Sequence, residues 1–235
     1  MTAHAPGDDA GRNGPRRSRA IELCATAAAI LALTGFAVAC GPKAPDYQSI
    51  WTTSSTPATT TTTGPPVPIG QYLEDEGVSG EQVAPDTLTD LTVSIPTPPG
   101  WEKYNNPNIK PQTEMIAKGG NLPTAMLTAF KLRGDFDAAD AVKHGYDDAE
   151  LSQNFKRLDA STADFHGFPS AMIQGSYDLD GKRLHSWSRI VIATGSPPAN
   201  QRYLVQLSIT SPADQAVSQA SDIEAIMAGF TVAAE

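Results

Sequence analysis

The clearest folding signal in this chain of 235 residues is the stretch AMIQGSYDLDGKRLHSWSRIVIAT, residues 171–194. It holds two runs rich in strand-forming residues, 171–178 and 183–194, on either side of Asp180-Gly181. An Asp-Gly pair favours the type I′ turn of a β-hairpin, because both of its residues tolerate a positive φ. We therefore expect two antiparallel strands joined by a tight turn.

Further strands are expected on both sides of this hairpin. Residues 202–210 alternate polar with apolar, as do residues 90–95 and 124–132, which is typical of half-buried strands. The side chains of the first of these runs that share an apolar face are Tyr203, Val205, Leu207 and Ile209. A short extended tail is expected at residues 230–232.

Two helices are expected among these strands. Asp135 offers an N-cap for a helix that runs to about residue 151, and Ser211-Pro212 precedes a final helix that Gly229 ends. The apolar stripe of the final helix is Ala213, Ala216, Val217, Ala220, Ile223 and Met227. The whole pattern predicts one α+β domain over residues 85–235, an antiparallel β-sheet flanked by helices.

The first forty residues carry an export signal. Four arginines between Arg12 and Arg19 precede an uncharged apolar run at 23–39, which ends in Ala37-Val38-Ala39-Cys40. This order resembles the lipobox of bacterial lipoproteins. We therefore expect residues 1–39 to be a signal peptide, and Cys40 to carry an S-diacylglycerol and an N-acyl chain that anchor the protein on the outer, extracytoplasmic face of the cell membrane. A transmembrane anchor and secretion with Cys40 unmodified are the alternatives, and the choice between Sec and Tat export is open.

Residues 40–84 have the composition of a disordered tether. Residues 52–63 contain eight threonines, two serines, one proline and one alanine, and further prolines follow. Such a segment has too few large apolar groups to offset the entropy lost on ordering. Threonine-proline stretches are also acceptors for O-linked sugars, so glycosylation of the tether is a hypothesis.

Charge and cysteine content exclude several classes of protein. Seventeen lysines and arginines against 26 acidic residues give a formal net charge of −9, which argues against a nucleic-acid partner. Two cysteines are too few for a disulfide scaffold or a cysteine-rich zinc site. With Cys24 removed in the signal peptide and Cys40 lipidated, the mature chain is expected to have no free thiol.

The order and spacing of several segments carry a family resemblance. The segments are VSIP at 93–96 before Gly100-Trp101, FHGFPS at 165–170, the hairpin turn at 180–181, RIVIA at 189–193, RYLVQL at 202–207, and DIEAI at 222–226 before Gly229-Phe230. Together they resemble the LpqN/LpqT family, lipoproteins of mycobacteria and related actinobacteria. The resemblance implies a PsbP-like fold, an α/β/α sandwich. It also implies a protein without established catalytic residues, and therefore no enzyme.

The sequence contains no recognisable catalytic or metal-binding motif. The histidines that remain after signal cleavage are His144, His166 and His185, and none has a second histidine at helical spacing to complete a metal pair. Neither a Gly-x-Ser-x-Gly nucleophile turn nor a glycine-rich phosphate loop is present. We expect no catalytic residue, no metal and no cofactor.

Trp101 and Tyr104 follow Pro98-Pro99-Gly100 on a loop, and we consider both to be candidate contacts for a lipid or glycan. The alternative is that Trp101 plugs one end of the core. The expected function is a non-catalytic binding module of the cell envelope. Its partner is an envelope protein, a wall lipid or glycan, or a host protein, so that the module is accessory to envelope machinery or a surface antigen. A hydrolase or other enzyme with a dispersed site is the alternative.

Overall fold

The structure, a computed structural model, describes residues 65–235, and this part of the chain contains ten strands and four α-helices. The expected signal peptide, Cys40 and residues 41–64 of the expected tether lie outside the described residues. The elements in chain order are α1 (Ile69–Asp75), β1 (Ser79–Val83), η2 (Pro85–Thr87), β2 (Leu91–Ser94), β3 (Trp101–Lys103), β4 (Glu114–Lys118), β5 (Thr124–Arg133), α2 (Ala138–Ala141), η3 (Val142–His144), α3 (Asp147–Glu150), β6 (Lys156–Ser161), β7 (Ser170–Leu179), β8 (Lys182–Thr194), β9 (Arg202–Pro212), η4 (Ala213–Gln215), α4 (Ala216–Gly229) and β10 (Thr231–Ala234).

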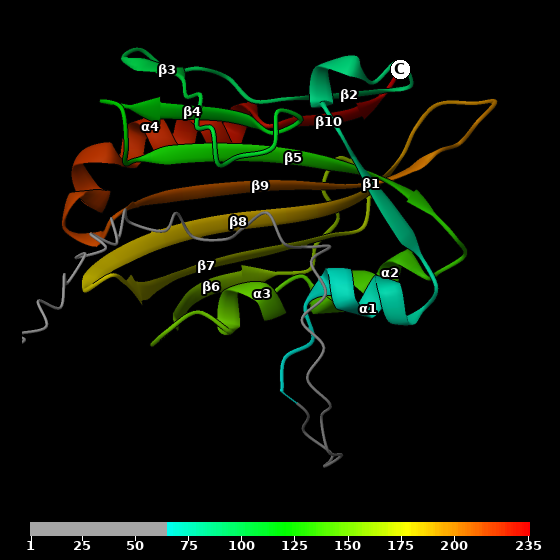
Figure 1. Ribbon diagram of the computed structural model, residues 1–235, viewed down its shortest axis with the longest axis horizontal. Helices are drawn as coiled ribbons and strands as arrows, with labels where there is room; N and C mark the ends of the chain where they lie inside the picture. Colours follow the sequence, from blue (N-terminus) through cyan, green and yellow to red (C-terminus); the bar gives the residue numbers. More distant parts are fainter. Residues whose placement is uncertain (1–64) are drawn as a thin grey trace, which may run out of the picture. The chain divides into compact units, whose positions relative to one another are not determined.

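Eight strands form one antiparallel sheet in the order β3-β4-β5-β9-β8-β7-β6, with β1 paired to β5 (Figure 1). Strands β2 and β10 form a separate two-stranded antiparallel ribbon. The predicted hairpin is β7–β8. Asp180 and Gly181 in its turn have φ values of +48° and +73°, the positive values that a type I′ turn requires. The predictions of strands at 90–95, 124–132 and 202–210 are confirmed as β2, β5 and β9.

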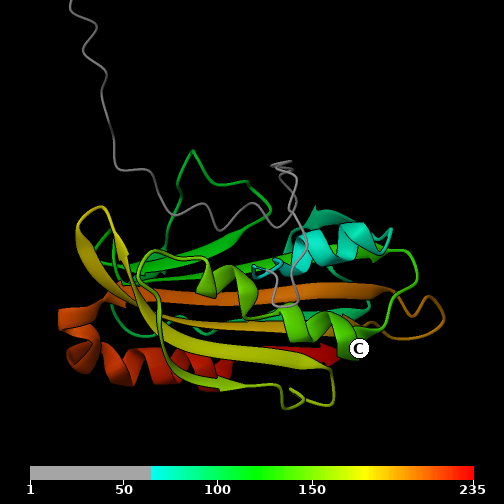
Figure 2. The same cartoon turned by 90° about the horizontal axis from the view of Figure 1, so that it is seen from below.

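The central strand β9 contributes to a core on each face of the sheet. Tyr203, Val205, Leu207 and Ile209 lie in the core that contains residues of α4 and of the β2–β10 ribbon, as their alternation predicts. Leu204 points to the other face and lies in a second core, together with residues of α1 and α2. Figures 1 and 2 show α4 on one side of the sheet and α1, α2 and α3 on the other. The expected α+β class, with helices on both faces of an antiparallel sheet, is confirmed.

The folded domain begins earlier than the predicted boundary at residue 85. Helix α1 buries Ile69 and Leu73 completely in the second core. Strand β1 pairs with β5, and Val83 stands opposite Ala129. Residues 69–83, for which the composition predicts a tether, are therefore part of the fold. The threonine and proline content of residues 40–84 predicts disorder for the whole segment. Ile69 and Leu73 nevertheless form an i, i+4 apolar pair, which packs one face of a short helix against the second core.

The predicted helix from Asp135 to about residue 151 is wrong as a continuous element. It is divided into α2, η3 and α3, and its N-cap is Asp137, whose side chain accepts hydrogen bonds from the N–H groups of Ala139 and Asp140. The break occurs at Gly145, which packs against β7. A Cβ at this position would lie 2.5 Å from the Cβ of Ala171, so the chain reaches the sheet only because a glycine stands here.

The final helix starts later than predicted. Strand β9 continues through Pro212, a short turn follows, and α4 begins at Ala216. Val217, which we placed on the apolar stripe, is 91% exposed, while the buried residues of α4 include Ile223 and Ile226. The predicted end of the helix at Gly229 and the extended tail after it are confirmed. In residues 65–235, no helix combines the length and the apolar character needed to cross a membrane.

Candidate functional site

Strands β8 and β9 change from apolar to polar along one face of the sheet. On the side of α1–α3, Ile190 and Ile192 face the second core, but the next positions of the same face are polar. These positions are Ser186 opposite Thr210, Ser188 opposite Ser208, and Gln206 opposite Ile190. All three polar residues of β9 are buried, and Gln206 is only 7% exposed. A row of buried polar groups at a helix–sheet contact needs a hydrogen-bonding explanation.

Helix α3 and the turn before it cover part of this polar row and enclose a small cavity. Its lining includes Gly145, Asp148, Ala149 and Ser152 from the helical segment, and the polar residues of β8 and β9 from the sheet. The cavity has a volume of about 20 Å³, enough for one water molecule or one hydroxyl group. We call this feature the α3 cleft.

The α3 cleft contains two hydrogen-bond acceptors without partners. One is Oδ2 of Asp148 and the other is Oε1 of Gln206. The carboxylate of Asp148 accepts a hydrogen bond from the backbone N–H of Ile69, but burial outweighs this contact and raises its pKa to about 6, with a smaller contribution from the neighbouring Asp147. A buried acceptor without a partner costs about 1–3 kcal/mol. The cleft is therefore suited to bind a group that donates hydrogen bonds.

The chain enters the domain beside the α3 cleft. The backbone N–H of Val67 donates to Oδ2 of Asp147 at 3.0 Å, and Nδ1 of His144 lies 3.1 Å from the same oxygen. The ring of His144 stacks on Tyr72 of α1 with 4.2 Å between the ring centres. These contacts hold the start of the domain against the helical segment that covers the cleft.

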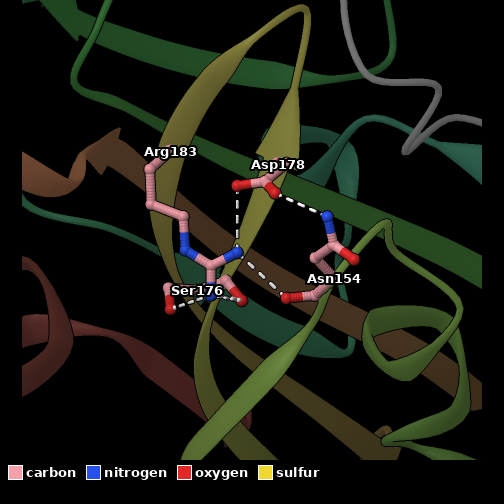
Figure 3. A network of polar contacts seen from close by, with 4 residues as sticks. All are labelled: Asn154, Ser176, Asp178 and Arg183. Carbon is pink, nitrogen blue, oxygen red and sulfur yellow. Dashed lines mark hydrogen bonds and ion pairs between the residues drawn. The ribbon is translucent and has the colours of Figure 1, made fainter.

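A polar clasp fixes the loop between α3 and β6 to the β7–β8 hairpin (Figure 3). Nη1 of Arg183 donates to Oδ1 of Asp178 at 3.0 Å and to the carbonyl of Asn154 at 2.9 Å. Nη2 donates to the carbonyl and the hydroxyl of Ser176, at 3.0 and 2.7 Å. The amide of Asn154 donates to Asp178, and this bond, followed by that from Arg183, lowers the pKa of the Asp178 carboxyl. Because the guanidinium of Arg183 is bonded to groups of the protein itself, we interpret this network as structural.

Trp101 and Tyr104 lie apart from the α3 cleft. Trp101 is 4% exposed and belongs to the core on the α4 side of the sheet. Its Nε1 donates to Oδ2 of Asp222 at 3.1 Å, and Nζ of Lys118 lies 2.6 Å from the same oxygen. The expectation that Trp101 contacts a ligand is corrected, because its ring is used by the core, as the alternative interpretation holds. Tyr104 is partly exposed, and a ligand contact there stays a prediction.

The other two histidines have structural surroundings. His166 has a positive φ of 53° in the loop before β7, and its ring stacks on Phe165. Nε2 of His185 lies 2.9 Å from the side-chain amide of Gln174, and burial lowers the pKa of His185. Within residues 65–235, no three histidine, cysteine, aspartate or glutamate side chains are grouped as a metal site would require.

Asp148 and Gln206 belong to no motif of the sequence that predicts a site. The alternation in RYLVQLSIT, residues 202–210, does place glutamine, serine and threonine on one face. The apolar half of that pattern predicts the strand. The polar residues of β9 indicate where the site lies. The position of α3 over them depends on Gly145, and a local sequence pattern does not show it.

Comparison with known proteins agrees with the described fold. Residues 65–233 match the family model described as "Probable lipoprotein LpqN". The chain is 65% identical over 227 residues to lipoprotein LpqT of Mycobacterium tuberculosis H37Rv, a match that covers 96% of this chain and all of the relative.

Two solved structures extend the comparison. The crystal structure of LpqN, described as involved in cell envelope biogenesis of Mycobacterium tuberculosis, matches with a TM-score of 0.62 and 21% identity over 72% of this chain and 99% of LpqN. Cyanobacterial PsbP from Synechocystis matches with a TM-score of 0.43 and 11% identity, over 75% of this chain and 98% of that protein. The first match shows the shared fold.

Proposed function

Because the chain belongs to the LpqN family of lipoproteins, we propose that it is an envelope lipoprotein whose folded domain binds a ligand without catalysing a reaction. In this proposal Cys40 carries the lipid that holds the domain on the extracytoplasmic face of the cell membrane. LpqN itself is described as involved in cell envelope biogenesis, and we propose an accessory role in the same process for this chain.

The observation that carries the proposal is the pair of unpartnered acceptors in the α3 cleft, Oδ2 of Asp148 and Oε1 of Gln206. Serine and threonine hydroxyls surround them, and these groups both donate and accept. A ligand that brings its own hydroxyl groups satisfies such a site, whereas an apolar ligand leaves both acceptors unpaired. We therefore propose a neutral, hydroxyl-rich ligand such as an envelope glycan. One of its hydroxyl groups enters the cavity and the rest lies outside.

The composition of the α3 cleft favours binding over catalysis. Among residues 65–235, the cavity is lined by one carboxylate and by no histidine. Glycoside hydrolysis uses a pair of carboxyl groups, and a serine nucleophile needs an adjacent base. One observation supports the alternative function, a hydrolase: the pKa of Asp148 is raised to about 6, which suits a general acid or base at neutral pH.

Saturation-transfer NMR on the full-length chain tests the proposal, with glucose and maltose as probes. We expect transfer to the sugar protons in the unmodified chain and a loss of about tenfold in affinity in Gln206→Leu, which removes an acceptor and keeps a similar volume. Val217→Ser on the exposed side of α4 is the matched control and should bind as the unmodified chain does. Equal transfer in Gln206→Leu and the unmodified chain would contradict binding in the cleft. Hydrolysis of a chromogenic glycoside or ester that disappears in Asp148→Asn would instead favour the enzyme.

A further inference from the structure

Arg189 lies on the face of the sheet opposite to the α3 cleft. It stands on β8 opposite Leu207, which belongs to the core on the α4 side. Its guanidinium carbon is 4.7 Å from the centre of the Phe165 ring and 5.6 Å from that of Trp187. The cation is therefore flanked by two aromatic rings and is only partly exposed.

The guanidinium of Arg189 has few partners within the protein. Nη1 donates to the hydroxyl of Ser170 at 3.1 Å, and that hydroxyl in turn donates to the carbonyl of Ala163 at 2.6 Å. Nε is buried and has no hydrogen-bond partner. Burial lowers the pKa of Arg189, and the nearby Tyr146 hydroxyl opposes this effect.

The other arginines of residues 65–235 each have an acidic neighbour. Arg133, Arg157 and Arg183 form ion pairs with Glu81, Glu150 and Asp178, and Arg202 is influenced by Asp135 and Asp137. Arg189 has no carboxylate partner among the described residues, although the chain as a whole is acidic, with a net charge of −9. A partly buried cation without a counter-charge is unfavourable, and the contacts with two rings offset only part of this cost.

We propose that Arg189 is the receptor for a single phosphate group, supplied either as free phosphate or as a phosphorylated lipid headgroup. Nη2 and the second N–H of Nη1, beside the one given to Ser170, are donors that can match two phosphate oxygens. The Phe165 and Trp187 rings lie 4.7 and 5.6 Å from the guanidinium carbon, and apolar surroundings of this kind strengthen charge-assisted bonds. A bound phosphate supplies the negative charge that the fold does not.

A small anion fits this site better than an acidic protein surface. One cation within a domain of strongly negative net charge cannot compensate the repulsion between two acidic surfaces. A small solute or a single lipid headgroup interacts mainly with the positive charge of Arg189 and less with the net negative charge of the domain. The proposal is independent of the α3 cleft, because the two sites lie on opposite faces of the sheet.

The test follows the arginine Nε–Hε signals of the 15N-labelled full-length chain in a non-ionic detergent during a titration with inorganic phosphate at constant ionic strength. Because Nε of Arg189 is buried, its hydrogen exchanges slowly enough to be observed. We expect a saturable shift of this signal, with a Kd on the order of 1 mM, and no comparable shift for Arg183, whose guanidinium is held by Asp178, Asn154 and Ser176. A shift that does not saturate, or that all arginines share, overturns the proposal.

Two variants complete the experiment. Arg189→Gln should weaken phosphate binding at least about tenfold, and Arg189→Lys, which keeps the charge but loses the fork, should weaken it by a smaller factor. Arg133→Gln is the matched control and should bind phosphate as the unmodified chain does. Phosphate binding that persists unchanged in Arg189→Gln overturns the proposal. A titration with dihexanoyl phosphatidic acid separates the two sources: tenfold tighter binding than inorganic phosphate identifies a lipid headgroup, and equal binding identifies free phosphate.

Discussion

Replacing Asp148 by asparagine should stabilise this protein at neutral pH. The side chain lies in the α3 cleft, where burial raises its pKa to about 6 from an ordinary value of 3.8. The folded state therefore holds the proton of Asp148 more tightly than the unfolded state does. The contribution of this group to stability is fully present below about pH 4 and is lost as the pH rises through 6. At pH 7 the folded protein carries an ionised carboxylate in an unfavourable environment.

The magnitude follows from the difference between the two pKa values. About 2 pKa units correspond to about 3 kcal/mol in the free energy of unfolding at pH 7. Asparagine keeps an oxygen that accepts from the Ile69 N–H and adds an NH₂ donor in the cavity that contains the unpaired Oε1 of Gln206. We expect Asp148→Asn to gain about 2–3 kcal/mol at pH 7 and close to nothing at pH 4.

Urea unfolding of the full-length chain between pH 4 and pH 8 measures this effect through the fluorescence of the buried Trp101 and Trp187. Asp164→Asn, at an exposed position in the loop before β7, is the control and should change stability by less than about 0.5 kcal/mol. The reasoning is refuted if Asp148→Asn destabilises the protein at pH 7, or if its effect is the same at every pH.

Three further substitutions test the fold, each by urea unfolding of the full-length chain. Ile69→Ala should lower the free energy of unfolding by about 2–5 kcal/mol, because the side chain is fully buried in the second core. An effect near zero would mean that residues 69–83 are not part of the folded domain. Gly145→Ala should cost about 1–3 kcal/mol, since the new methyl group would lie 2.5 Å from the Cβ of Ala171, and a neutral result would mean that the helical segment moves freely on β7. Trp101→Phe should cost about 1–2 kcal/mol through loss of the Nε1 hydrogen bond to Asp222. An unchanged stability would show that this bond contributes nothing.

Local chemistry explains which elements the sequence predicted correctly. Asp180 and Gly181 specify a tight turn by their own backbone preferences, and the strands on either side alternate with a period of two. The apolar face of β9 is visible for the same reason. The family resemblance rests on these segments together with those at 93–101, 165–170 and 222–230, and the 65% identity to LpqT confirms it.

Elements that depend on distant contacts were predicted less well. Ile69 and Leu73 form a helix that is stable only against the second core, so a short apolar pair after a proline-rich segment gave too weak a local signal. The ring of Trp101 is buried because α4, more than a hundred residues later in the chain, supplies Asp222 as its hydrogen-bond acceptor. The sequence next to Ile69 does not predict α1, and the sequence next to Trp101 does not predict the burial of its ring.

The sequence by itself determined the antiparallel hairpin and the apolar face of the central strand, because each depends on residues close together in the chain, and it determined the family through the order and spacing of several such segments. Only the tertiary structure decided where a ligand could be received. The α3 cleft forms because Gly145 lets a helical segment approach β7 and places Asp148 over the polar residues of β9. The raised pKa of Asp148 and the unpaired acceptor of Gln206 both result from that burial. Burial is a property of the packed chain, which no single segment possesses.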